Sequence, residues 1–195
     1  PALFFIAGEG HWGPGGSNTR LMMYADRDGD STYEFTTISD AISSDYLYGY
    51  TSFEVVSNDT IIAATTVHSG WPTDAARIAT QMQRFVYTSG TDTWAGSNPY
   101  TGFTTPYWVT DVVKRPGGGT WMSGACNSSI DGGVWRLIGA AWTNTAATVE
   151  DVTCLSFSRG GSMLYAGSGS TCDYGTVMKT SDPGSASPTW SVLLN

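Results

Sequence analysis

The stretch Val152–Gly167, VTCLSFSRGGSMLYAG, predicts a β-hairpin, because an apolar strand is followed by a Gly-rich turn and by a second strand that ends in small residues. Two earlier stretches have the same plan, Ser52–Thr66 (SFEVVSNDTIIAATT) and Val109–Cys126 (VTDVVKRPGGGTWMSGAC). Each hairpin is followed by a loop, another apolar run, a second turn and an aromatic residue after Thr or Ala. The chain is therefore built from repeats.

The aromatic residues after the second turn give the length of the repeat. Trp94, Trp142 and Trp190 are separated by 48 and 48 residues (142 − 94 and 190 − 142). A period of about 40–50 residues is typical of the four-stranded blade of a β-propeller. We therefore predict an all-β fold, a β-propeller of about four blades that forms one domain over residues 1–195. Its approximate repeat units are residues 1–40, 51–98, 107–148 and 150–195. The alternative is a β-sandwich or jelly roll, which also consists of many short strands.

Three of the four repeats are expected to hold four strands. In the last repeat these are residues 152–157, 163–167, 176–179 and 189–194, and the two middle repeats have strands at 52–56, 61–66, 84–87 and from 93, and at 108–114, 120–126, 134–138 and from 141. The first repeat offers only residues 3–7, 20–24 and 32–38. A missing inner strand leaves backbone hydrogen-bonding groups unpaired. We expect a three-stranded blade, a strand donated by another chain, or a fragment of a larger propeller.

Composition restricts the partners and the compartment. The net charge is −8, and only nine Lys and Arg residues are scattered along the chain, so a nucleic-acid partner is not expected. No apolar stretch approaches the roughly 18 residues of a membrane helix, so membrane insertion is not expected. Three cysteines fit no zinc template and allow one disulfide. These features favour a secreted, extracellular or virion-surface protein.

A short motif occupies the turn before the last strand of two repeats. Residues 26–33 read DRDGDSTY, and the last repeat has TSDPG at 180–184 followed by Thr189-Trp190. Both are similar to S-x-D-x-G-x-T-W, the Asp box of sialidase-like (BNR) propellers, while the middle repeats keep only Thr93-Trp94 and Trp142. The resemblance, with its degenerate boxes, implies a structural device. In that family the Asp accepts backbone hydrogen bonds within the turn, and the aromatic ring packs between blades.

The acidic turn of the first repeat is also a candidate calcium site. Asp26, Asp28, Asp30 and Glu34 occupy positions 1, 3, 5 and 9 of a loop, the spacing at which oxygen ligands converge on Ca²⁺. Ser31 stands where the usual sharp-turn glycine belongs, and position 12 has no bidentate Glu. The alternative is a solvated acidic turn that serves only the Asp box.

Aromatic residues and histidines gather in the loops of one predicted rim. In a propeller, the connections between the second and third strands and those between repeats emerge on the same face. Such rings suit stacking on a sugar or anchoring a protein partner, and the alternative is packing over the blade ends. The candidate ligand-binding residues are His11, Trp12, Tyr48, His68, Trp71 and Tyr100.

Two cysteines follow second strands on that same rim. Cys126 and Cys172 belong to neighbouring repeats, so a disulfide between them is predicted. Cys154 lies inside a predicted strand, where burial as a small apolar side chain is expected.

These observations favour a non-catalytic recognition module that binds a glycan or another protein chain. One alternative is a structural building block of a surface assembly. The other is a sialidase-like glycoside hydrolase or a fragment of one. Sialidases that resemble this fold need three arginines, a Tyr-Glu pair and an Asp acid, and no arginine here lies in an F/Y-R-I/L-P pattern. No catalytic residue is therefore assigned.

Overall fold

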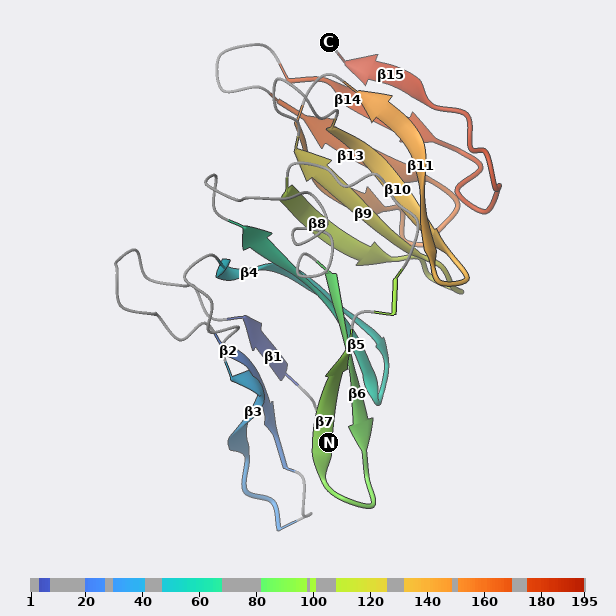
Figure 1. The fold of residues 1–195 in the computed structure, drawn as a ribbon. Coiled ribbons are helices and arrows are strands. Elements are labelled where there is room, and N and C mark those ends of the chain that lie inside the picture. The colour runs from blue at the N-terminus through green and yellow to red at the C-terminus, as the bar shows by residue number, and fades with distance from the viewer. Residues whose placement is uncertain are drawn as a thin grey trace. The chain divides into compact units, whose positions relative to one another are not determined.

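The computed structural model describes residues 4–7, 20–26, 30–40, 47–67, 82–97, 99–100, 108–125, 132–148, 151–169 and 175–194 (Figure 1). These residues form fifteen strands in four sheets, and none of them is helical. Every strand pairing with a determined register is antiparallel. The all-β prediction is confirmed.

The N-terminal half of the chain forms two sheets. Sheet 1 contains β1 (Phe4–Ala7), β2 (Arg20–Ala25) and β3 (Glu34–Asp40). Sheet 2 contains β4 (Leu47–Ser57), β5 (Thr60–Val67), β6 (Met82–Thr88) and β7 (Thr93–Ser97). In both sheets each strand lies beside its neighbour in the chain, as an antiparallel meander does. Sheet 1 has three strands, as the first repeat predicts.

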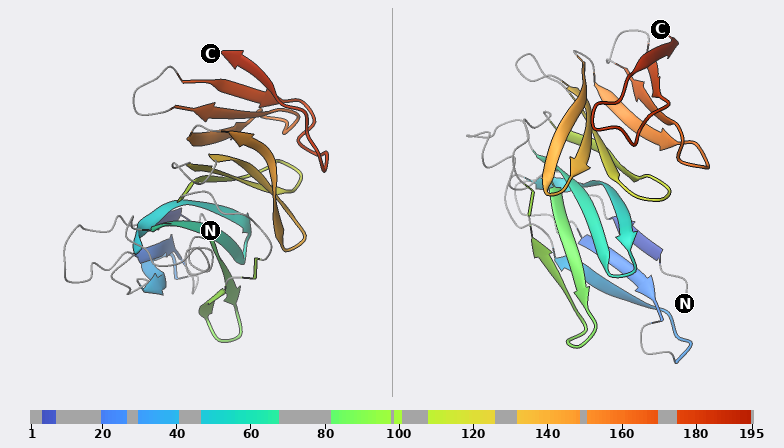
Figure 2. Two further views of the ribbon diagram at one scale, coloured as in Figure 1. Left: turned by 45° about the horizontal axis from the view of Figure 1, so that its top comes forward. Right: turned by 90° about the vertical axis from the view of Figure 1, so that its right-hand side faces the viewer.

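The C-terminal half repeats this plan (Figure 2). Sheet 3 contains β8 (Trp108–Lys114), β9 (Thr120–Ala125), β10 (Gly132–Ile138) and β11 (Ala141–Thr148). Sheet 4 contains β12 (Val152–Phe157), β13 (Leu164–Ser168), β14 (Val177–Thr180) and β15 (Ser191–Leu194). The strands begin and end close to their predicted limits, because alternating apolar runs and Gly-rich turns mark them in the sequence.

The chain divides into two compact units, each of which holds two sheets. Unit 1 comprises Pro1–Phe53 and Ser57–Asn98, and unit 2 comprises Glu54–Val56 and Pro99–Asn195. The grouping of all four sheets into one propeller domain stays a prediction.

In unit 1 the core lies between sheets 1 and 2. Leu21, Met23 and Ala25 alternate along β2, so their side chains share one face of sheet 1. They join a buried cluster with Ile61 and Phe85, which are cross-strand partners in sheet 2. Burying such side chains stabilises each by about 1.5–3 kcal/mol. The packing of one sheet face on the next therefore holds unit 1 together.

In unit 2 the core lies between sheets 3 and 4. Trp121 of β9 and Val134 of β10 are fully buried against side chains of sheet 4. The residues that sheet 4 contributes are Val152, Leu155, Leu164, Ala166 and Met178. The Trp121 ring lies 6.5 Å from the ring of Phe157 and 6.4 Å from that of Trp190, both edge-on. Such aromatic pairs add about 0.5–1.5 kcal/mol to the effect of burial.

Polar contacts join the same two sheets. The Leu155 N–H donates to Asp111 Oδ2 at 2.9 Å, and the Thr110 hydroxyl donates to the Val152 carbonyl at 2.5 Å. Arg115 Nε donates to the Gly161 carbonyl at 2.8 Å. Arg136 donates to the Gly184 carbonyl at 2.8 Å and also to that of Ser185. Sheet 3 therefore holds both the first strand and two turns of sheet 4.

A residue larger than glycine at position 161 would force neighbouring atoms to move. Gly161 has a φ of +67°, and a Cβ at this position would lie 2.9 Å from the carbonyl oxygen of Pro116 in the turn of sheet 3. A left-handed backbone and close approach both require glycine here. The hairpin turns of sheets 3 and 4 therefore lie side by side.

Both units use the same pair of sheet faces. We call the face that packs on the next sheet of the unit the forward face, and the opposite face the backward face. The forward face is lined by Leu21, Met23 and Ala25 in sheet 1 and by Trp121 and Val134 in sheet 3. Each packs on the backward face of the following sheet, so the forward-on-backward contact occurs twice in this chain.

Candidate functional site

The predicted binding loops are equivalent connections in the strand order of two sheets. They connect β1 to β2 in sheet 1 and β5 to β6 in sheet 2. His11, Trp12, His68 and Trp71 lie in these connections, outside the described residues. The structure therefore does not test whether their side chains come together.

Of the two tyrosines in the predicted site, Tyr100 lies in a connection between repeats as predicted, between β7 and β8, and Tyr48 does not. Tyr48 lies within β4, not in a connection between repeats, and nothing is described of its side chain. Tyr100 is only 8% exposed, and its ring lies 5.7 Å from the ring of Trp142. This contact agrees with the packing alternative, so we remove Tyr100 from the candidate binding surface.

The acidic turn between β2 and β3 is held by its own carboxylates. The Ser31 N–H donates to Asp26 Oδ2 at 3.2 Å, and the Thr32 N–H donates to Asp30 Oδ1 at 2.6 Å. Ser31 has a φ of +70°, a left-handed conformation stabilised by these local bonds. Glu34 is exposed at the start of β3, and Asp28 lies outside the described residues. Within the described residues, no three potential metal ligands form a cluster.

The turn between β14 and β15 shows a similar use of an aspartate. Asp182 Oδ1 accepts hydrogen bonds from the Thr180 hydroxyl at 2.5 Å and from the Thr189 N–H at 3.0 Å. These bonds, above all that from Thr180, favour the charged carboxylate and lower the pKa of Asp182 below its usual value. Asp182 thus joins the two halves of the turn across seven residues.

In each of the four sheets, the aromatic residue after the last turn lies on the backward face. Trp94 packs on the core of unit 1, and Trp190 packs on Trp121 in the core of unit 2. Trp142 is buried against Tyr100. Tyr33, the equivalent residue of sheet 1, is 38% exposed and lies beside the ring of Tyr24 at 5.5 Å. Three of the four aromatics are thus covered, and the one in sheet 1 is not.

The cysteine predictions have separate outcomes. Cys126 and Cys172 lie outside the described residues, so their disulfide stays a prediction. Cys154 is a free thiol but is exposed, and the expectation that it is buried is wrong. Val152 and Leu155 of β12 face the core, while Cys154 points to the opposite, forward face of sheet 4.

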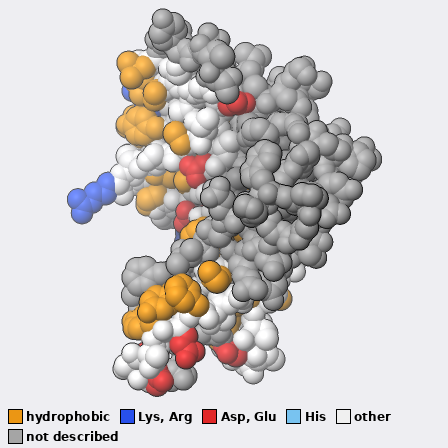
Figure 3. All heavy atoms as spheres, turned by 90° about the vertical axis from the view of Figure 1, so that its left-hand side faces the viewer, with side chains coloured by type: hydrophobic (Ala, Val, Ile, Leu, Met, Phe, Trp, Pro, Cys, Tyr) orange, Lys and Arg blue, Asp and Glu red, His pale blue; other side chains and the backbone are white. Residues whose placement is uncertain are grey.

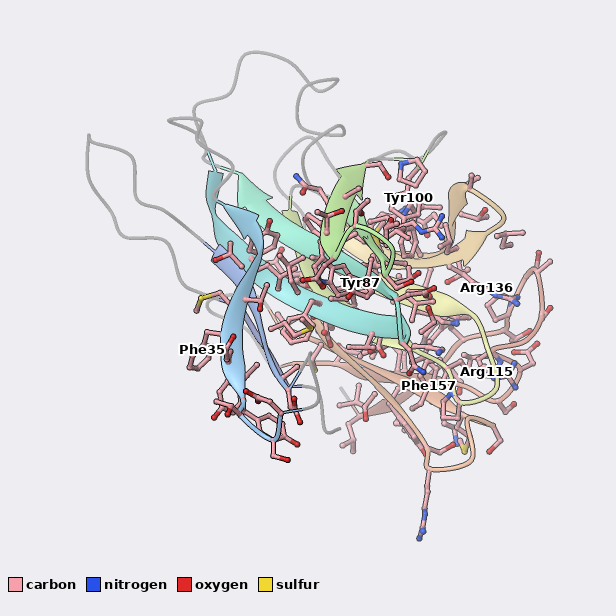
Figure 4. All side chains as sticks on the ribbon, turned by 90° about the horizontal axis from the view of Figure 1, so that it is seen from below. Phe35, Tyr87, Tyr100, Arg115, Arg136 and Phe157 are labelled. Carbon is pink, nitrogen blue, oxygen red and sulfur yellow. The ribbon has the colours of Figure 1, made fainter. Side chains whose placement is uncertain are left out.

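Arg136 makes a contact between sheets 3 and 4 that the sequence motifs do not predict. Its guanidinium carbon lies 5.7 Å above the Trp121 ring, and its two carbonyl partners lie 48 and 49 residues further along the chain. Figure 4 shows Arg115 and Arg136 near one another in unit 2. The repeat length is the signal in the sequence that could have indicated this contact. Arg136 and Gly184 are 48 residues apart, which is also the spacing of Trp94, Trp142 and Trp190.

No protein-family model matches the chain, and no curated protein matches it. Within the described residues, no helix is long and apolar enough to cross a membrane. The function is therefore inferred from the residues themselves.

Proposed function

We propose that this chain is a non-catalytic recognition module of the Asp-box propeller type, secreted or displayed on a virion surface. It binds a glycan or a protein through the loops that connect the second and third strands of its sheets. The observation that carries this proposal is the meander order of the four sheets. That order gives the loops with His11, Trp12, His68 and Trp71 equivalent positions in sheets 1 and 2.

The turns support the Asp-box part of the proposal. Asp182, at the Asp position of the box, accepts a backbone N–H across its turn. In sheet 1 the box Asp is Asp28, outside the described residues, and the flanking Asp26 and Asp30 each accept a backbone N–H within the turn. Trp94 and Trp190 pack in the cores between two sheets, where the resemblance expects the aromatic residue. The sheets themselves are short meanders of three or four strands, the size of propeller blades.

The chemistry of the loops supports a glycan or protein ligand. Trp12 and Trp71 each offer a broad apolar ring with an N–H donor, and His11 and His68 lie one and three residues before them in the chain. Apolar rings beside hydrogen-bonding groups match sugars, whose faces carry C–H groups and whose edges carry hydroxyls. The net charge of −8 disfavours a polyanionic ligand.

Replacing Trp12 or Trp71 with alanine is expected to weaken ligand binding without lowering the melting temperature. Anchoring aromatic residues contribute about 2 kcal/mol or more, so the Kd should rise by roughly 30-fold. Glycan-array screening, followed by calorimetric titration of the glycan that binds, measures this change. Tyr33→Ala is the control, because it also removes an exposed aromatic ring, but from a turn at the other end of β2.

Two outcomes would contradict this proposal. If Trp12→Ala and Trp71→Ala lower the melting temperature and leave binding unchanged, the loops pack over the sheets and the chain is a structural building block. If the wild type hydrolyses a sialoside or another glycoside, the glycosidase alternative replaces the recognition module.

Calcium is a second proposal for the acidic turn. Asp26, Asp28, Asp30 and Glu34 would hold Ca²⁺ through carboxylate oxygens, the ligands this hard cation prefers. A metal bound only by the native state raises its stability, so saturating Ca²⁺ should increase the melting temperature relative to chelator. Asp30→Asn should reduce that increase. Superimposed melts with Ca²⁺ and with chelator would leave the turn as a hydrogen-bonded structure only.

A further inference from the structure

The strands of sheets 3 and 4 correspond in order and pairing, and this correspondence identifies the face of sheet 4 that is equivalent to the forward face of sheet 3. In sheet 3 the cross-strand partners Val113, Trp121 and Arg136 share the forward face. In sheet 4 the equivalent partners are Ser156, Tyr165 and Lys179. Each set lies in one row across three strands, because directly paired residues point to the same side of a sheet. Tyr165 thus takes the place of Trp121, and Lys179 that of Arg136.

Described side chains on the forward face of sheet 4 are exposed or only half-buried. Cys154 and Ser156 are exposed on β12, and Tyr165 and Lys179 are half-buried. Leu194 of β15 pairs with Val177 on this face and is 67% exposed. An aromatic ring and a cation are therefore partly exposed and a large aliphatic side chain is largely exposed, at positions where sheet 3 packs on its neighbour.

The backward face of sheet 1 also has exposed side chains among its described residues. Tyr24 and Phe35 are cross-strand partners with ring centroids 4.7 Å apart, and Tyr33 lies next to them. Phe35 is 61% exposed. Figure 4 shows its side chain pointing away from sheet 2, and Figure 3 shows hydrophobic side chains gathered beside acidic ones in the lower part of that view. Clustered exposed aromatic rings of this kind mark interaction sites.

The two faces are complementary in their aromatic residues. In unit 2 the forward-face ring of Trp121 meets Trp190, the aromatic residue that follows the last turn of sheet 4. Tyr165 has the position of Trp121, and Tyr33 has the position of Trp190. A sheet 4 placed on a sheet 1 would bring these two tyrosines together in the same way.

The two faces are complementary in charge. Arg136 on the forward face of sheet 3 donates to carbonyls in the turn between β14 and β15. Lys179, in the equivalent position of sheet 4, would reach the equivalent turn of sheet 1. That turn contains Asp26, Asp28 and Asp30, so a cation would meet carboxylates there.

We propose that the forward face of sheet 4 docks on the backward face of sheet 1 of a second copy of this chain. The contact repeats the forward-on-backward packing that already forms the core of each unit. It joins two different surfaces, so association is head-to-tail and continues until a ring closes. The site is separate from the proposed ligand-binding loops, and either proposal can fail without the other.

Sedimentation equilibrium of the whole chain and two variants tests this assembly. Phe35→Asp places a charge on the backward face of sheet 1, and Lys179→Glu reverses the charge on the forward face of sheet 4. We expect the wild type to reach at least twice the monomer mass as concentration rises, and each variant alone to stay monomeric. A mixture of the two variants should form a one-to-one dimer, because each keeps the face that the other lacks.

Ile138→Asp is the matched control, since it also places a charge at an exposed apolar residue, but at the end of β10 in sheet 3. It should associate like the wild type. Circular dichroism melts should show all three variants folded. A wild type that is monomeric at every soluble concentration overturns the proposal, as does a mixture that stays monomeric. If the wild type is monomeric and Phe35→Asp lowers its melting temperature, another part of the same chain covers this face, and the proposal is wrong.

Discussion

Trp121→Ala is expected to lower the free energy of unfolding of unit 2 by about 3–5 kcal/mol, the range for removing a fully buried Trp. Trp121 is inaccessible to solvent and packs on Phe157, Trp190 and the guanidinium of Arg136. Its removal leaves a cavity in the core between sheets 3 and 4, into which the strands relax only in part. Denaturant unfolding followed by fluorescence and by circular dichroism measures the loss.

Trp121→Phe separates the effect of the ring from that of the indole N–H. The Trp121 N–H is buried and has no hydrogen-bond partner among the described residues. Phenylalanine keeps an aromatic ring on Phe157 and Trp190 and removes the unsatisfied donor, so Trp121→Phe should cost less than Trp121→Ala. Ile138→Ala, at a 42% exposed residue, should stay within about 0.5 kcal/mol of the wild type. Equal losses for Trp121→Ala and Ile138→Ala would contradict the position of Trp121 in the core.

The strands were the most predictable feature of this protein. Each hairpin has apolar residues with period two and a turn of Gly, Asn or Asp, and such local signals set the limits of a strand without tertiary information. The clearest difference is β4, which begins at Leu47 and not at Ser52. The sequence predicts a binding loop at Tyr48, among the residues before Ser52. Aromatic residues favour strands as well as loops, and Tyr50 in fact packs in the core of unit 1.

Contacts between sheets were not predictable in the same way. Arg136 and its partner Gly184 are 48 residues apart, and their contact depends on which faces of two sheets meet. The error at Cys154 has the same origin. A position inside a strand predicts burial only if another sheet covers that face, and Cys154 is exposed on the forward face of sheet 4. The candidate binding site depends on loops outside the described residues, so this site remains a prediction.

Loss of the predicted Cys126–Cys172 disulfide is the second large effect that we expect. The bridge would close a loop of 46 residues (172 − 126), and such a loop stabilises the native state by about 3–4 kcal/mol through the lost entropy of the unfolded chain. The strands around it agree with the pairing. Cys126 directly follows β9, and Cys172 follows β13, the equivalent strand of the sheet that shares the core of unit 2.

The ends of these two strands lie at one side of that core. The Thr110 hydroxyl contacts both Ser123 of β9 and the carbonyl of Val152, whose strand partner is Ser168 at the end of β13. Peptide mass mapping without reductant should therefore find a Cys126–Cys172 link and a free Cys154 thiol. Cys126→Ala, Cys172→Ala and the double variant should lose the same stability, because one bridge is removed in each case. Cys154→Ala should change little, since that thiol is exposed. A link that contains Cys154 would contradict the correspondence between sheets 3 and 4, because that residue lies on the first strand of its sheet, not beyond the second.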